Sequence, residues 1–136
     1  MSEDFDKITS NLVYLENTDR LHYLLELAKK NKGILDELKN DDNRIWGCVS
    51  TSYLIVNEIE PIVDISTDSD AMFVKGLLYL LKIFVNGKTK DEILNVNEEE
   101  LMEKIGMKNT ITSQRINGFY AAIKKLKKVL DGYKSI

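Results

Sequence analysis

Residues 49–85 decide the fold, and they read VSTSYLIVNEIEPIVDISTDSDAMFVKGLLYLLKIFV. Val49–Asn57 is rich in β-branched and aromatic residues and predicts a strand, and Pro61–Ser66 predicts a second strand after a short polar turn. Ala71–Val85 is apolar almost all round, which is typical of a helix buried at the centre of a domain. Because a hairpin of two strands is marginally stable in water, we expect helices to cover it, and a short third strand can join its edge.

Two helices are predicted before this segment. Thr18 is a favourable N-cap, and leucines at helical spacing follow it. A second, shorter helix is predicted at Gly33–Lys39, with Ile34, Leu35 and Leu38 turned inward.

Capping residues mark the starts of the remaining helices. Ser69 or Asp70 is predicted to cap the central helix. Thr89 opens a capping box with a glutamate three residues later, Asn97 caps the next short helix, and Thr112 caps the last one. The order of helices, hairpin and helices indicates an α+β fold, in which a small antiparallel sheet of two to three strands packs against several helices.

The last predicted helix is amphipathic. Its apolar side chains recur every three or four residues and predict a buried stripe: Ile116, Phe119, Ile123, Leu126, Leu130 and Tyr133. Its basic side chains are predicted to form the solvated face: Lys124, Lys125, Lys127 and Lys128.

Composition narrows the class of protein. A chain of 136 residues without repeats or linkers predicts a single domain, residues 1–136. Its net charge of −3 argues against a nucleic-acid partner. The N-terminus is acidic and has no targeting pattern, and the longest apolar stretch is too short and too charged for a membrane span. We therefore expect a cytoplasmic protein with no membrane partner.

Cys48 is the only cysteine of the chain. A single cysteine excludes an internal disulfide, a CxxC redox pair and a metal site built mainly from thiolates. If Cys48 is chemically active, it is a nucleophile or a covalent carrier; the alternative is a small buried apolar residue. His22, the only histidine, lies in a leucine-rich helical segment, where a structural role is expected rather than a Cys–His pair.

Four motifs together resemble the SufE family of sulfur-acceptor proteins. NRIWGCVS at 43–50 is similar to the family pattern N-x-I-x-G-C-x-S, DSDA stands at 68–71, VKGL follows at 74–77, and TSQRINGF at 112–119 is similar to S-x-x-R-x-x-G-[LF]. The motifs occur in family order, and the likeness extends over residues 15–130.

The chain departs from the family pattern at several positions. Trp46 stands where proline is usual, Tyr53 where tryptophan is frequent, and Thr110 where a histidine often precedes the arginine motif. The missing histidine leaves open any role of that side chain. The cysteine, the two aspartates and the arginine of the motifs are all present.

The resemblance implies a SufE/IscU-like fold and a sulfur-transfer function. It implies that the protein is an accessory protein rather than an enzyme, which accepts persulfide sulfur on Cys48 from a SufS-like, PLP-dependent cysteine desulfurase and raises the turnover of that enzyme. The sulfur would pass to a downstream Fe–S scaffold. The protein would need no cofactor of its own, since PLP resides on the desulfurase.

The resemblance also implies which residues surround the thiol or dock the partner: Arg44, Gly47, Asp68, Asp70 and Arg115. Either arginine could favour the thiolate, whereas carboxylates close to the sulfur would favour the neutral thiol. With Ile45 and Trp46 beside it, we expect Cys48 to be neutral and partly covered in the free protein. A purely structural role stays open for two of these residues, because Asp70 can be a helix cap and Arg115 a surface ion-pair partner.

Other functions also remain open at this stage. They are a CsdE-like relay of sulfur to other acceptors, a docking module with an incidental cysteine, and a cysteine hydrolase. A cluster scaffold of the IscU type is disfavoured, because such a scaffold uses several cysteines.

Overall fold

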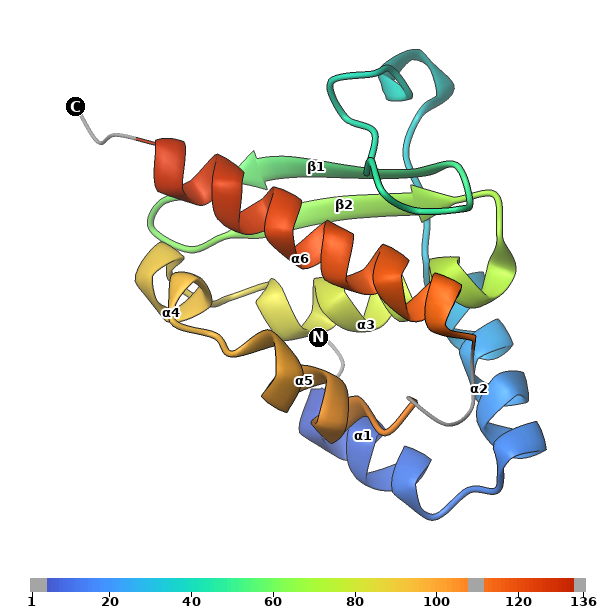
Figure 1. Cartoon of the computed structure of the whole chain (residues 1–136). Helices are drawn as coiled ribbons and strands as arrows, with labels where there is room; N and C mark the ends of the chain where they lie inside the picture. Colours follow the sequence, from blue (N-terminus) through green and yellow to red (C-terminus); the bar gives the residue numbers. More distant parts are fainter. Residues whose placement is uncertain (1–4, 108–111, 134–136) are drawn as a thin grey trace.

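A two-stranded antiparallel sheet lies against the helices in the computed structural model, which describes residues 5–107 and 112–133 (Figure 1). Strand β1 (Ser52–Glu58) pairs with β2 (Asp64–Ser69). A single bridge from Arg44 to Tyr53 extends the β1 edge, so the possible third strand is reduced to one residue pair. The predicted α+β class with its small antiparallel sheet is therefore confirmed.

Both strands begin about three residues later than predicted, with β1 starting at Ser52 and β2 at Asp64. The late start of β2 has a clear cause in the backbone hydrogen bonds of Val63. The Val63 amide donates to the Lys88 carbonyl, and the Gly87 amide donates to the Val63 carbonyl. The chain before Asp64 thus pairs with the turn that follows the central helix instead of with β1.

The pleat of the hairpin sorts its side chains onto two faces. Ser52 lies opposite Ser69, and Leu54 lies opposite Thr67; all four are buried. Tyr53 lies opposite Asp68 on the other face, because successive side chains of a strand alternate. This alternation decides which polar groups reach the cysteine.

The N-terminal region differs most from the prediction. Helix α1 (Phe5–Val13) was not foreseen, and α2 (Asn17–Lys30) begins before Thr18, with Glu16 at the N-cap position. Arg20 stabilises the turn between these helices by donating to the carbonyls of Leu12 in α1 and Leu15 in the turn, and to the carbonyl of Gly106.

The short helix predicted at Gly33–Lys39 is wrong. Only a single 3-10 turn, η1 (Asp36–Leu38), forms there, and Leu35 and Leu38 are exposed while Ile34 is buried. The amide of Gly33 donates to the Asn31 side chain, and the amide of Ile34 donates to the Asp68 carboxylate. These bonds hold the segment along the sheet, where Gly33 has a φ of 73° and Leu35 a ψ of 139°, and neither angle fits a right-handed helix.

Helix α3 (Met72–Val85) is the buried central helix, as predicted, and it packs against α2 and β2. Its predicted side-chain cap is wrong. Ala71 occupies the N-cap position without a side-chain cap bond, because the Asp70 carboxylate accepts from the Thr51 amide instead. The Ser69 hydroxyl accepts from the Ala71 amide just before the helix.

The remaining helices begin at their predicted caps. Thr89 forms a capping box at α4 (Lys90–Leu94), Asn97 caps α5 (Glu98–Ile105), and Thr112 caps α6 (Ser113–Gly132). Figure 1 shows α6 running across the hairpin, and it packs against β1 and α3.

The apolar stripe of α6 is buried from Ile116 to Leu130, whereas Tyr133 lies beyond the helix and is exposed. The prediction that all four lysines of α6 are solvated is wrong for two of them. Lys125 and Lys127 are half-buried and donate to the carbonyls of Asp42 and Val96.

Within the described residues, no helix has the length and apolar character required to cross a membrane.

Candidate functional site

Cys48 lies on a loop that doubles back onto the start of β1. The Ile45 amide donates to the Ser52 carbonyl at 2.8 Å, which ties the two ends of the loop together. Gly47 has a φ of 89°, a left-handed conformation that glycine adopts without a steric penalty. The turn at Gly47 leaves Cys48 half-buried, with its thiol directed toward the hairpin and α6.

Two serine hydroxyls lie within hydrogen-bond distance of the sulfur, and a third, from Ser69, contacts both of them. The Cys48 Sγ lies 3.0 Å from the Ser50 Oγ and 3.5 Å from the Ser52 Oγ. Ser52 donates to Ser69 at 2.9 Å, and Ser69 donates to Ser50 at 3.3 Å. With those two hydrogens committed, the Ser50 hydroxyl is left to donate either to the sulfur or to the Ser52 Oγ, 2.9 Å away.

The backbone of α6 covers another side of the sulfur at Gly118. A Cβ atom at this position would lie 2.6 Å from the Cys48 Sγ, well inside the sum of the van der Waals radii. Only glycine leaves room for the thiol in its present position. The glycine of the S-x-x-R-x-x-G motif is therefore a packing partner of the cysteine.

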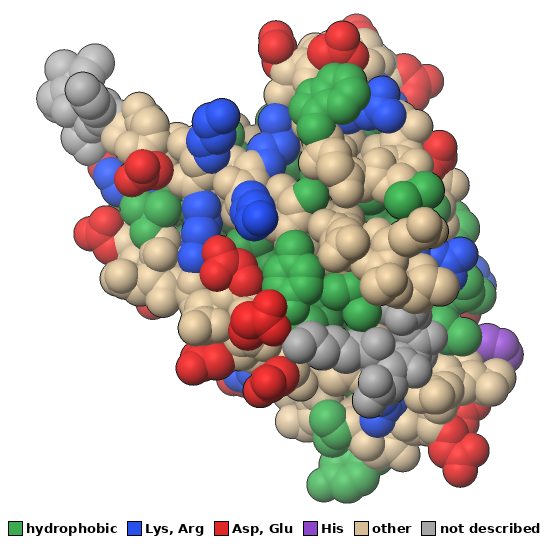
Figure 2. Space-filling model, in the orientation of Figure 1, with side chains coloured by type: hydrophobic (Ala, Val, Ile, Leu, Met, Phe, Trp, Pro, Cys, Tyr) green, Lys and Arg blue, Asp and Glu red, His purple; other side chains and the backbone are tan. Residues whose placement is uncertain are grey.

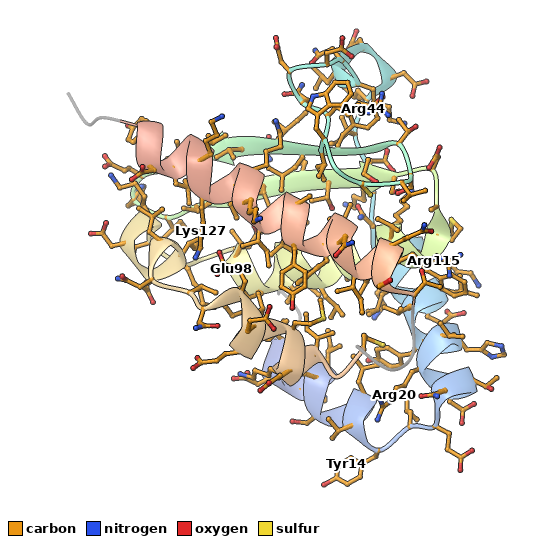
Figure 3. The ribbon with its side chains drawn as sticks, viewed as in Figure 1. Tyr14, Arg20, Arg44, Glu98, Arg115 and Lys127 are labelled. Atoms are coloured by element: carbon orange, nitrogen blue, oxygen red, sulfur yellow. The ribbon has the colours of Figure 1, made fainter. Side chains whose placement is uncertain are left out.

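A cleft of about 400 Å³ opens beside Cys48. The loop, the start of α3 and the start of α6 line it together, with Cys48, Asp70, Ala71 and Arg115 among the lining residues. The Arg115 guanidinium lies over the ring of Phe73 at 4.8 Å, which holds it at the α3 side of α6 (Figure 3). The cleft therefore joins a thiol, a guanidinium and a carboxylate that are far apart in sequence.

Asp70 also fixes the chain that carries the cysteine. Its Oδ1 accepts from the Thr51 amide at 3.1 Å, and its own amide donates to the Thr51 carbonyl. This reciprocal pair fastens the end of β2 to the residue that follows Ser50. Asp70 is thus both a wall of the cleft and an anchor of the loop.

Asp68 lies on the opposite face of the hairpin and does not line this cleft. Its carboxylate accepts from the amides of Ile34 and Ser69 and pairs with Lys39 and Lys75 at 3.2 and 3.4 Å. Burial acts to raise the pKa of Asp68, but these amides and lysines together lower it below its ordinary value. The expectation that Asp68 would hold the thiol neutral has no support in this geometry.

Arg44 and Trp46 lie outside the cleft, on the outer side of the loop. The Arg44 guanidinium lies over the Trp46 ring at 4.5 Å, and both line a neighbouring groove. Trp46 is 59% exposed and Ile45 is buried in the core, so neither covers the sulfur as expected from the sequence. The groups that lie against the Cys48 sulfur are instead Gly118, Ser50 and Ser52.

The other candidate groups lie elsewhere. His22 is exposed on α2 and lines a separate cavity with Leu25 and Met72. In the described part of the chain, no three His, Cys, Asp or Glu side chains are grouped so as to hold a metal ion. Thr110, which replaces the usual histidine of the family, lies outside the described residues.

Sequence reasoning missed the roles of Ser52, Ser69 and Gly118. The alternation of side chains along a strand was available as a signal for the two serines, since both point to the core face from opposite strands. The contact between Gly118 and Cys48 joins residues 70 positions apart, and no local pattern predicts it.

Comparisons with known proteins show what the chain is similar to. Residues 6–130 match the SufE family, described as an Fe-S metabolism associated domain. An uncharacterized SufE-like protein of Rhizobium etli is 31% identical over 127 residues, which cover 90% of this chain and 86% of that protein. Another, from Rhizobium meliloti, is 27% identical and covers 93% of this chain and 94% of its own length.

A solved structure shares the fold. The solution structure of a hypothetical protein from Thermus thermophilus superposes with a TM-score of 0.76 and covers 93% of each chain. Its sequence identity of 19% supports the fold and nothing finer.

Proposed function

This chain belongs to the SufE family, whose domain is associated with Fe–S metabolism, and we propose that it accepts sulfur on Cys48 from a PLP-dependent cysteine desulfurase. In this proposal the protein also raises the turnover of the desulfurase, because it frees the cysteine of that enzyme for the next cycle. The sulfur then passes to an Fe–S scaffold or, in a CsdE-like relay, to another acceptor.

The proposed step is an exchange at sulfur without net oxidation or reduction. The Cys48 thiolate attacks the outer sulfur of the persulfide on the desulfurase cysteine. The new bond joins the Cys48 Sγ to that sulfur, the old sulfur–sulfur bond breaks, and the desulfurase cysteine leaves as a thiolate. The proton lost by the Cys48 thiol balances the one that this leaving thiolate gains.

The observation that carries the proposal is the setting of the single cysteine. Its sulfur is held by serine hydroxyls on one side and lies beside an open cleft lined by Arg115 on the other. The cleft provides room for a second sulfur, and a guanidinium on its wall favours a terminal sulfur that carries negative charge.

The enzyme alternative lacks its second catalytic group. A cysteine hydrolase needs a base beside the nucleophile, usually histidine, and the single histidine of this chain is on α2 at another cavity. In the proposal the protein therefore acts as an accessory to the desulfurase. PLP stays on that enzyme, and the exchange takes place in the cytoplasm, where thiols remain reduced.

A turnover assay tests this function. The desulfurase is supplied with PLP and L-cysteine, and sulfide release in the presence of a reductant is followed with and without this protein. We expect wild type to raise turnover and Cys48→Ser to lose that effect while folding normally. Equal stimulation by the serine variant would favour the docking-module alternative.

A further inference from the structure

A second concave surface adjoins the cysteine loop and is strongly basic. We call it the basic groove; its walls carry Arg44, Trp46, Gly47, Lys124, Lys125 and Lys128. It runs between the outer side of the loop and the exposed side of α6, and it has a volume of about 620 Å³. Figure 2 shows several Lys and Arg side chains together over α6, above a group of Asp and Glu side chains over α4 and α5.

The cations of the basic groove make no direct ion pair within the described residues. None of its lining residues is acidic, and no ion pair is found there for Arg44, Lys124, Lys125 or Lys128. Lys127, which does not line the groove, pairs with Glu98 at 3.0 Å (Figure 3), and Lys124 also acts on that carboxylate through space. Four cations on one surface of a chain of net charge −3 are an uneven distribution that favours an acidic partner.

Contacts with neighbouring groups hold two of the cationic side chains of the groove in place. Lys125 donates to the Asp42 carbonyl at 2.8 Å and so connects α6 to the segment that precedes the cysteine loop. Arg44 is held over the Trp46 ring, which leaves the exposed indole beside the cations. The groove thus offers an exposed indole beside several cations.

Its length indicates the kind of occupant. From Asn117 to Lys128 the helix rises about 16 Å at roughly 1.5 Å per residue. A single phosphate or carboxylate would occupy only one end of this span. An extended peptide of about five residues matches it at roughly 3.3 Å per residue.

We propose that the basic groove binds an acidic, extended segment of the cysteine desulfurase. This inference rests on the function proposed above, because it uses the position of Gly47, which lines the groove next to Cys48. A partner that delivers sulfur to Cys48 must cover the rim of this loop. Carboxylates of the partner segment then lie along Lys124 and Lys128, and an apolar side chain of that segment contacts Trp46.

The test compares two double variants with the same change in net charge. Lys124→Glu with Lys128→Glu reverses the groove, whereas Lys7→Glu with Lys32→Glu reverses two exposed lysines that do not line it. The Kd for the desulfurase is measured by calorimetry at low and high salt. We expect the groove variant to weaken binding by about tenfold or more at low salt and to flatten the salt dependence, with little change for the control pair.

A sulfur-uptake measurement separates the two proposals. At saturating concentrations the groove variant should still take sulfur onto Cys48, because the thiol and its cleft are unchanged. Equal weakening by both pairs, or by neither, would overturn the basic groove as the docking site. The docking proposal would also be overturned if the groove variant lost binding of an RNA oligonucleotide while its Kd for the desulfurase stayed unchanged. If wild type did not bind the desulfurase at all, the proposed function itself would fail.

Discussion

At the scale of single residues, the serine hydroxyls give the sulfur of Cys48 a hydrogen-bonded position. Ser50 is the closest of them, at 3.0 Å, and its hydrogen is not committed to Ser69. A hydroxyl that donates to a thiolate or a persulfide anion stabilises the reacting form and aims it. This makes Ser50 a positioning residue for the proposed exchange.

Replacing this hydroxyl should slow sulfur uptake. We expect Ser50→Ala to lower the rate of sulfur transfer to Cys48 by about tenfold, since a hydrogen bond to a charged group contributes about 1.5–3 kcal/mol. The rate is measured in single-turnover experiments with the persulfide-loaded desulfurase. Ser10→Ala, on an exposed position of α1, is the control, and equal rates for the two variants would contradict the role of Ser50.

Gly118 should control access to the thiol. A methyl group there would lie 2.6 Å from the Cys48 Sγ, so Gly118→Ala forces the sulfur away from the helix and out of its hydrogen bonds. We expect slow alkylation of wild type by iodoacetamide and faster alkylation of this variant. Gly132→Ala is a matched control in the same helix, because a methyl group there meets nothing within 4 Å. Alkylation of wild type at the rate of a free model thiol would contradict the shelter of Cys48.

At the scale of elements, Asp68 joins the segment around η1 to β2 and α3. Its folded pKa is lowered below the ordinary 3.8, so it stabilises the fold fully above that value and loses this effect as pH falls through the folded pKa. We expect Asp68→Asn to be less stable than wild type at pH 7 and the difference to shrink below about pH 4. Urea unfolding at pH 7 and pH 3 measures the difference in unfolding free energy between the variant and wild type. A difference that does not change with pH would contradict the stabilisation by the ionised carboxylate.

The buried stripe of α6 is the main attachment of that helix to the hairpin and α3. Leu126 is 1% exposed, and Leu126→Ala should cost about 2–5 kcal/mol of unfolding free energy. Lys124 is exposed on the same helix, and Lys124→Ala should change that free energy by less than about 0.5 kcal/mol. Denaturant unfolding gives both values; similar small losses would mean that the stripe contributes little.

Elements whose signals are local could be predicted from the sequence. Thr89, Asn97 and Thr112 cap their helices as expected, because a cap depends only on the next three residues. The segment at 33–39 could not be predicted, since Asp68, a residue far along the chain, takes the Ile34 amide. Strand alternation would place Asp68 and Asp70 on one face, since they are two residues apart. They differ because β2 ends at Ser69 and the Asp70 carboxylate, beyond the strand, accepts from the Thr51 amide.

The candidate site was predictable in part for a similar reason. Cys48, Asp70 and Arg115 do share one cleft, although they come from three separate motifs. Asp68 and Arg44 do not line it, because one lies across the sheet and the other on the outer side of the loop. Sequence motifs indicated which residues to consider, and the packing of the hairpin against α6 decided which of them meet.

At the scale of the whole molecule, the fold brings the cysteine loop, the start of α3 and the start of α6 to one place. The same loop has the basic groove on its outer side, so the thiol and the proposed docking surface adjoin each other. A carrier of sulfur needs both features, because it must bind its donor and then leave with a protected cargo.

The central claim is that Cys48 carries sulfur, and the mass of the protein tests it most directly. The protein is incubated with the desulfurase, PLP and L-cysteine, separated without reductant and digested for mass spectrometry. We predict that the peptide containing Cys48 gains one sulfur atom, that a reductant removes it, and that Cys48→Ser gains none. A wild-type protein that stays unmodified while the desulfurase itself carries persulfide would contradict the account.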